Sequence, residues 1–134
     1  MSVDVAHQES ATGQIALKEA AREASLRQTT LAVIHVVEAL DLDIEAAFKS
    51  GLTDEVTQVL TESGLADLAW DLHLVTAKDD VPDAILKLAG EVSAELLVIG
   101  ARRRSPVGKF LLGSVTQTLV LDAGMPILVV KPPA

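Results

Sequence analysis

With 134 residues, a formal net charge of −8 and no cysteine, the chain has the length of one ordinary domain, residues 1–134, and excludes disulfides and thiolate metal sites. Aromatic residues make up only 2% of the sequence, so this acidic chain lacks both the positive potential and the stacking surfaces with which proteins bind nucleic acids. No apolar run approaches the roughly 20 residues of a membrane span and the amino terminus has no signal-peptide pattern, so we expect a soluble cytoplasmic protein that does not bind membranes.

Apolar runs at intervals along the chain predict the strands of a sheet. Three runs, TTLAVIHVV, ELLVIG and MPILVV, are apolar at both odd and even positions, which is typical of strands covered on both faces. The run LAWDLHLVT alternates between apolar and polar residues, which indicates one wet face or a place near the sheet edge. With the start of the chain, these runs predict five strands, at residues 3–8, 30–37, 67–75, 95–100 and 126–130.

Amphipathic segments between these runs predict helices. Apolar residues recur at helical spacing in the first segment, and the segment after the third strand begins with acidic residues and Pro82 and ends at a glycine. Residues 41–49 also have helical propensity, but we expect Ser50 and Gly51 to break any helix there. The predicted helices are residues 12–27, 53–63, 79–90 and 115–121.

Strands that alternate with helices are typical of βαβ units, which build a parallel sheet with right-handed crossovers. We therefore expect an α/β fold, with a five-stranded parallel sheet of the Rossmann-like type flanked by about four helices. In such sheets, ligands bind beyond the carboxyl ends of the strands, where the strand order reverses.

The loop GARRRSPVGKFLLGS, Gly100–Ser114, begins at one such strand end. Ser114 is placed to cap the next helix, so Gly113 and Ser114 lie at a helix amino end, where free amides and the helix dipole favour an anion. Four cations in this loop reverse the sign of an otherwise acidic chain: Arg102, Arg103, Arg104 and Lys109. The pattern fits a phosphate site and a plain solvated loop before a capped helix equally well.

Other nucleotide, metal and catalytic motifs are not found. A P-loop would require a glycine at position 103, which is Arg103, and a hydroxyl residue at position 110, which is Phe110. The first strand leads into HQESATG rather than into a G-x-G-x-x-G turn. The spacing of His7, His35 and His73 fits no metal motif, so we interpret them as ordinary strand or loop residues and expect neither a metal site nor catalytic residues.

Two segments carry a resemblance to a known family. VIGARRRSPVGKFLLGSVTQTLVLDAGMPILVVK resembles the carboxyl-terminal signature of the universal stress protein family, and SATGQIALKEAAREASLRQTTLAVIHV resembles its first helix and second strand. The resemblance covers nearly the whole chain. It implies the adenine nucleotide alpha hydrolase-like form of the Rossmann-like fold, and a stress-response binding or signalling module rather than an enzyme, with at most very weak ATP hydrolysis.

The resemblance also implies where a nucleotide would bind. Nucleotide-binding members hold ribose and phosphates with a glycine, two residues, a second glycine, nine residues, and then glycine with serine or threonine. Gly100 matches the first glycine, Gly113 and Ser114 match the last pair and are followed by Val115, and Arg103 stands at the second glycine. A side chain at position 103 either crowds the ligand or reaches towards its phosphates.

The end of the first strand departs from the family pattern of aspartate, one residue and serine, in which the aspartate contacts adenine. Gln8 and Ser10 occupy these two positions, and Gln8 can still donate and accept hydrogen bonds to a base edge. Glu9 adds a negative charge that disfavours a triphosphate. Val36 matches a position whose backbone touches the base. The resemblance thus implies ATP or another adenine nucleotide as ligand, and the alternative is a dimeric protein–protein adaptor that binds no nucleotide.

The family also implies a homodimer that pairs through the last strand. Pro126 and Pro132 bracket a short apolar run, and Pro126–Val130 suits an exposed sheet edge that pairs with its own copy. The alternative is a last strand that the tail of its own chain covers.

Overall fold

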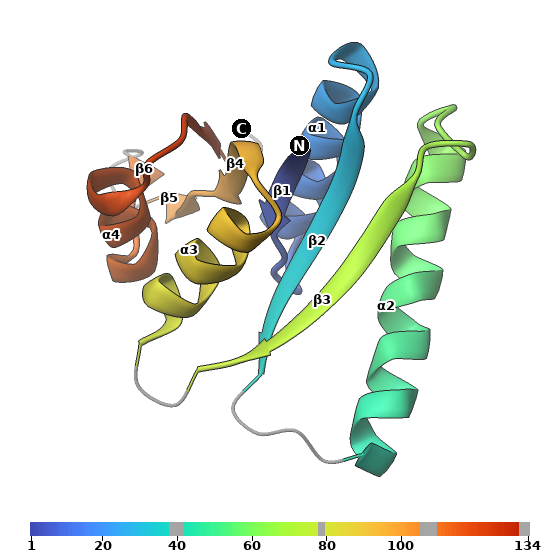
Figure 1. Cartoon of the computed structure of the whole chain (residues 1–134), viewed down its shortest axis with the longest axis horizontal. Coiled ribbons are helices and arrows are strands. Elements are labelled where there is room, and N and C mark those ends of the chain that lie inside the picture. Colours follow the sequence, from blue (N-terminus) through green and yellow to red (C-terminus); the bar gives the residue numbers. More distant parts are fainter. Residues whose placement is uncertain (38–41, 78–79, 105–109, 132–134) are drawn as a thin grey trace.

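A computed structural model describes residues 1–37, 42–77, 80–104 and 110–131 of the chain. Within these residues, five parallel strands form a central sheet in the order β3-β2-β1-β4-β7 (Figure 1). The chain runs outward from the central strand through β2 to β3 on one side, and later adds β4 and β7 on the other side. These strands are β1 (Ser2–Ala6), β2 (Thr30–Val37), β3 (Trp70–Thr76), β4 (Ala94–Gly100) and β7 (Ile127–Val130).

In the described part of the chain, four helices cover this sheet, and each of its faces packs against two of them (Figure 1). One face packs against α1 and α2, and the other face packs against α3 and α4. The bounds of the helices are α1 (Ala11–Leu26), α2 (Leu42–Glu62), α3 (Val81–Glu91) and α4 (Ser114–Asp122). The expectation of a five-stranded parallel sheet of the Rossmann-like type with flanking helices is confirmed.

The two faces of the sheet have different cores. On the first face, the buried side of α1 consists mainly of alanines, which lets the helix lie close to the strands, while Val56 and Leu60 of α2 fill the space beside it. On the second face, Ile85 of α3 and Leu119 of α4 pack on aliphatic side chains of β2 and β4. Burial of each such Val, Leu or Ile side chain contributes roughly 1.5–3 kcal/mol to the free energy of unfolding.

The largest error of the sequence analysis concerns α2. The expected break at Ser50 and Gly51 is wrong, because α2 continues through both residues from Leu42 to Glu62. Its buried residues, Leu52, Val56 and Leu60, lie four residues apart on one helix face, and their packing outweighs the cost of about 1 kcal/mol for one glycine. Tertiary packing therefore overrides the local turn signal.

Smaller differences lie at the ends of elements. β1 ends at Ala6 rather than at residue 8, because the chain turns there to bring Ser10 to the N-cap of α1. β3 begins at Trp70 rather than at residue 67, after a turn in which the amide of Leu68 donates to the carbonyl of Leu65. α3 begins after the N-cap Asp80, and the first residue of its predicted range, position 79, lies outside the described residues.

The loop after β4 contains two short strands that the sequence analysis did not predict. β5 (Arg102–Arg104) pairs antiparallel with β6 (Phe110–Leu111). This ribbon links the carboxyl end of β4 to the amino end of α4, which is the segment that the glycine and arginine pattern singled out.

Candidate functional site

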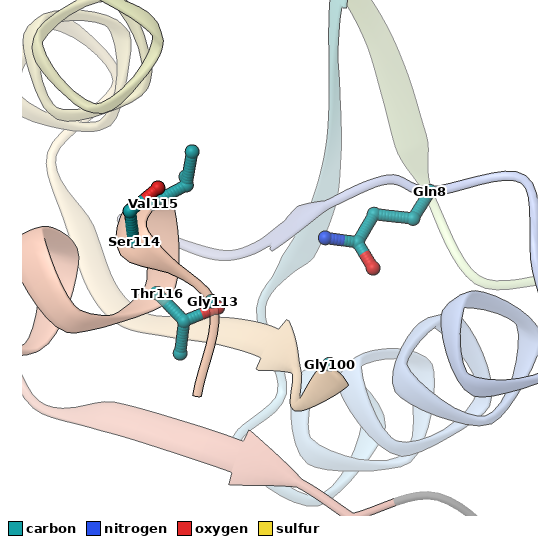
Figure 2. Close-up of a pocket in the computed structure, with 6 residues that line it drawn as sticks. All are labelled: Gln8, Gly100, Gly113, Ser114, Val115 and Thr116. Carbon is teal, nitrogen blue, oxygen red and sulfur yellow. The ribbon is translucent and has the colours of Figure 1, made fainter. Parts of the chain in front are cut away.

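The candidate site lies at the carboxyl ends of β1 and β4, in the middle of the sheet. The chain leaves β1 towards β2 on one side, whereas β4 pairs with β1 on the other side, so the strand order reverses between β1 and β4. The connections on the two sides of such a point separate, which opens a crevice beyond the strand ends. Figure 2 shows this pocket between the loop after β1, the tip of β4 and the first turn of α4.

Two adjoining cavities occupy the crevice. The outer cavity has a volume of about 250 Å³ and is lined by Gln8, Gly100 and residues 113–116. The inner cavity has a volume of about 150 Å³ and shares Gln8, Val115 and Thr116 with the outer cavity. Most of its other lining residues are aliphatic: Ala6, Ile34, Val36, Val81, Ile85, Ile99 and Leu119. An apolar cavity that adjoins a polar one suits a ligand with a flat apolar part and a charged part.

Gln8 reaches the cavities from the loop after β1, and its side chain extends towards the first turn of α4 (Figure 2). The carbonyl oxygen of Gln8 accepts a hydrogen bond from the amide of Ser10 at 3.0 Å. The hydroxyl of Ser10 in turn accepts the amide of Gly13 at 3.0 Å and so caps α1. A Cβ atom at Gly13 would lie 1.9 Å from the carbonyl oxygen of Gln8, so only glycine lets α1 begin this close to the loop.

Gly100, at the end of β4, borders the outer cavity near α1. A Cβ atom at this position would lie 2.9 Å from Cγ2 of Thr12 and 3.6 Å from Oε1 of Gln8. Any side chain here would therefore press against α1 and against the glutamine amide. Glycine at this position lets the end of β4 lie close to α1 and to the side chain of Gln8.

The amino end of α4 borders the opposite side of the outer cavity. Gly113 takes the N-cap position with extended backbone angles, φ −66° and ψ 164°, and no side chain caps the helix. The amide of Gln117 donates to the carbonyl of Gly113 at 3.0 Å, so the amides of residues 114–116 precede the first intrahelical bond. The prediction that Ser114 caps this helix is wrong, because α4 begins at Ser114 itself. Uncapped amides and the helix dipole together attract an anion.

The structure places the remaining expected site residues in different surroundings. Val36 lines the inner cavity, at the end of β2. Ser10 lines neither cavity, because it serves as the N-cap of α1. The backbone of Arg103 lies in β5, three residues beyond Gly100, while its side chain is outside the described part of the structure. Lys109 also lies outside the described residues.

Two histidines form a contact that the sequence analysis missed when it interpreted them as ordinary strand or loop residues. Nδ1 of His7 lies 2.9 Å from Nδ1 of His35. A signal for this contact was present, because the two histidines follow Ala6 and Ile34, which are paired residues of neighbouring parallel strands. Within the described ranges, no group of three or more His, Cys, Asp or Glu side chains is arranged to hold a metal ion.

The chemistry offered by the outer cavity is that of a binding site. Its described lining consists of glycines, an amide, two hydroxyls, a valine and the free backbone amides of α4, with no titratable side chain among these residues. Such groups can hold a base edge and an anion, but they cannot exchange protons with a substrate near neutral pH. In the same described ranges, no helix combines the length and the apolar character that a membrane span requires.

Comparisons with known proteins identify relatives over nearly the whole chain. A family model described as the Universal stress protein family matches residues 2–131. A universal stress protein of Mycolicibacterium smegmatis is 39% identical over 121 residues, which cover 90% of this chain and 89% of the relative. A solved universal stress protein from Archaeoglobus fulgidus is 32% identical, with 98% of both chains covered and a TM-score of 0.77. A structure from the same organism in complex with dAMP is 28% identical, with 98% of both chains covered and a TM-score of 0.74.

Proposed function

Because this chain belongs to the universal stress protein family, we propose that it is a binding or signalling module that holds an adenine nucleotide in the inner and outer cavities. The observation that carries the proposal is the junction of an aliphatic cavity with the uncapped amino end of α4. A base needs the first feature and a phosphate needs the second. The related Archaeoglobus fulgidus structure in complex with dAMP supports the same class of ligand.

In this proposal the base lies in the inner cavity, against Val36 and Ile85. Gln8 stands where the two cavities meet, and its amide can both donate to and accept from the edge of the base. Because the side-chain amide of Gln8 carries no charge, its hydrogen bonds orient the base without attracting or repelling the phosphates. Ser10 acts indirectly, by fixing the backbone of Gln8 through the N-cap of α1.

The phosphates lie at the amino end of α4, where Gly113 leaves room and Ser114 and Val115 present backbone amides. The part of the outer cavity that Gly100 lines accommodates the ribose. Arg103 follows in β5, and we propose that its guanidinium adds a charge-assisted contact to the phosphates. ATP, ADP and AMP all satisfy this arrangement, and the charge of Glu9 beside Gln8 favours the less charged ligands.

We propose binding without efficient catalysis, as expected from the lining of the outer cavity. Phosphoryl transfer requires metal ions or positioned cations and a group that orients the nucleophile. The described lining supplies backbone amides and hydroxyls, so hydrolysis of ATP is at most very slow.

We also propose that the protein is a homodimer in which β7 pairs with the β7 of a second copy. β7 lies at one end of the strand order, so one of its sides has no neighbouring strand among the described residues. Val120 and Leu121, on the helix that leads into β7, are 43% and 82% exposed. An unpaired edge with exposed apolar side chains next to it in the chain suits association between copies.

The nucleotide proposal is tested by denaturing the purified protein, measuring released adenine by its absorbance, and titrating refolded protein with AMP, dAMP and ATP in a calorimeter. We expect heat of binding from at least one of these ligands. Gly113→Val should weaken binding at least about tenfold, which corresponds to 1.4 kcal/mol, because it adds bulk to a residue that lines the outer cavity. The extended backbone of Gly113 accepts valine, so the variant should fold.

The matched control is Gly124→Val, since a Cβ atom at Gly124 meets nothing within 4 Å and this glycine lines neither cavity. This variant should bind as the unaltered protein does. Absence of both released nucleotide and heat would remove the nucleotide from the function and would favour the alternative, a protein–protein adaptor of the same fold.

A further inference from the structure

Three polar side chains form a chain of contacts beside the inner cavity, which we call the histidine relay: Glu55, His7 and His35. Oε2 of Glu55 lies 3.2 Å from Nε2 of His7, and Nδ1 of His7 lies 2.9 Å from Nδ1 of His35. The side chain of His7 is fully buried, and that of Glu55 is 24% exposed. The relay therefore joins three elements, because Glu55 belongs to α2, His7 follows β1 and His35 lies near the end of β2.

The carboxylate fixes the positions of the protons along the relay. Ionised Glu55 can only accept, so Nε2 of His7 carries the proton of that contact. Nδ1 of neutral His7 is then a hydrogen-bond acceptor, and it can be satisfied only if Nδ1 of His35 carries a proton and donates it. The geometry thus assigns His7 and His35 to opposite tautomers, and Nε2 is the basic atom left on His35.

One member of the relay, His7, itself lines the inner cavity, and His35 and Glu55 extend the relay away from the two cavities. His7 precedes Gln8, which lines both cavities. The backbone amide of His7 donates to the carbonyl of Ile34 at 2.8 Å. His35 precedes Val36, which lines the inner cavity. The intact relay therefore links the ends of β1 and β2 next to Gln8 and Val36, two residues that line the inner cavity.

A positive charge on His35 opposes this arrangement. Burial first, and then the neighbouring His7, hold the pKa of His35 below its ordinary value, while Glu9 and Glu55 act in the opposite direction. The ring of His35 also packs on Phe48 of α2, with ring centroids 4.7 Å apart. These are the titratable and aromatic groups that face His35 from the segment after β1 and from α2 within the described residues. Protonated His35 still carries a proton on Nδ1, but burial disfavours its charge, and an outward turn would solvate that charge. The outward turn would leave the buried Nδ1 of His7 without its donor.

We propose that the histidine relay is an acid-sensitive latch on the nucleotide site: it holds the ends of β1 and β2 together when neutral and releases them when protonated, so that nucleotide affinity falls in acid. This regulation rests on the proposed nucleotide function. Simple attraction between a protonated histidine and the phosphates would instead raise nucleotide affinity in acid, so the direction of the change in affinity separates the two mechanisms.

The first experiment measures the relay in the unaltered protein without any ligand. Long-range ¹H–¹⁵N spectra at about pH 8 should show His7 protonated at Nε2 and His35 protonated at Nδ1. Saturation with AMP should then lower the apparent pKa of His35, because a ligand that prefers the neutral relay must disfavour protonation of this residue. A His35 protonated at Nε2, or a pKa raised by AMP, would overturn the latch.

The second experiment measures the dissociation constant of AMP between about pH 8 and pH 5.5, at about 0.15 M salt to screen long-range attraction. In the unaltered protein, affinity should fall at least about fivefold over this range. His35→Gln keeps a donor for Nδ1 of His7 but cannot titrate, so its affinity should stay level apart from the titration of AMP itself, which both proteins share. His73→Gln, on β3 and outside the relay, is the matched control and should keep the fall.

The outcomes separate this inference from the proposed function. Binding of AMP at about pH 8 with the same pH dependence in the unaltered protein and in His35→Gln would overturn the latch and leave the nucleotide site intact. Affinity that rises in acid would overturn it in favour of direct attraction. No binding at any pH would overturn both proposals together.

Discussion

Asp4 carries an ionisable side chain into the centre of the sheet, in β1. The residue is fully buried; Oδ1 accepts the hydroxyl of Ser2, and Oδ2 has no hydrogen-bond partner among the described residues. Burial raises the pKa of Asp4 above its ordinary value, against the smaller opposite effects of Ser2, His73 and the amino terminus. The folded protein therefore binds this proton more tightly than the unfolded chain does, and the free energy of unfolding falls as pH rises from 3.8 through the folded pKa.

Asp4→Asn should remove this loss, because the amide cannot ionise. At about pH 7 we expect the variant to be more stable by roughly 1–2 kcal/mol, with a gain that shrinks towards the acid end of the titration. Denaturant unfolding at several pH values measures both effects. Asp71→Asn, an exposed aspartate on β3, should change stability by less than about 0.5 kcal/mol. If Asp4→Asn and Asp71→Asn changed the free energy of unfolding by the same amount, the burial of the Asp4 carboxylate would not destabilise the protein as we expect.

At the scale of single residues, the sequence analysis identified glycines and chain positions better than side-chain contacts. Gly100 and Gly113 stand out because a glycine at a strand end or before a helix is visible in the sequence alone. The contact between His7 and His35 depends on strand register, which brings together residues 28 positions apart. Glu55, which contacts His7, comes from a helix whose path over the sheet the apolar pattern does not define.

At the scale of elements, α2 shows how packing decides a helix that local signals would interrupt. Gly51 lies inside α2, is exposed, and a Cβ atom there would meet nothing within 4 Å. Gly51→Ala should therefore stabilise the protein by roughly 0.5–1 kcal/mol, since alanine loses less backbone entropy in a helix. Thermal or denaturant unfolding followed by circular dichroism measures the change.

The contrasting change is Gly13→Ala, which adds the same methyl group to the first turn of α1. Here the new atom would lie 1.9 Å from the carbonyl oxygen of Gln8, so the loop after β1 must shift. We expect destabilisation of roughly 1–3 kcal/mol. A stabilised Gly13→Ala protein, or a destabilised Gly51→Ala protein, would contradict the packing that the structure gives these two helices.

The elements themselves were predictable wherever burial is nearly complete. The strand boundaries of β2 agree with its apolar run, and α1 follows from its alanine spacing, because both patterns come from contact with one core. The antiparallel pair β5 and β6 was not predictable, since strands of three and two residues are too short to show an apolar period. The N-cap of α4 was misplaced by one residue, because glycine and serine both suit that position.

At the scale of the whole molecule, the proposed homodimer depends on the side of β7 that has no neighbouring strand among the described residues. The amide of Leu97 donates to the carbonyl of Pro126, and the amide of Ala101 donates to the carbonyl of Val130. In a parallel ladder these bonds use every second residue of β7, so the backbone groups of Ile127 and Val129 point away from β4. These outward groups are the ones that a second copy of β7 would pair with.

Val129→Pro tests this pairing, because it removes an outward donor while the ladder with β4 keeps its own hydrogen bonds. We expect sedimentation or light scattering to give the mass of a dimer for the unaltered protein and the mass of a monomer for the variant. The matched control is Thr76→Pro at the end of β3. The amide of Leu31 donates to the carbonyl of Ala69, so the odd-numbered residues of β3 bond to β2 and the amide of Thr76 points away from the sheet. This control should remain a dimer, because it alters the opposite edge of the sheet. A monomeric unaltered protein, or a Val129→Pro variant that stays dimeric, would show that β7 does not pair with its own copy, and the exposed Leu121 would then need another partner.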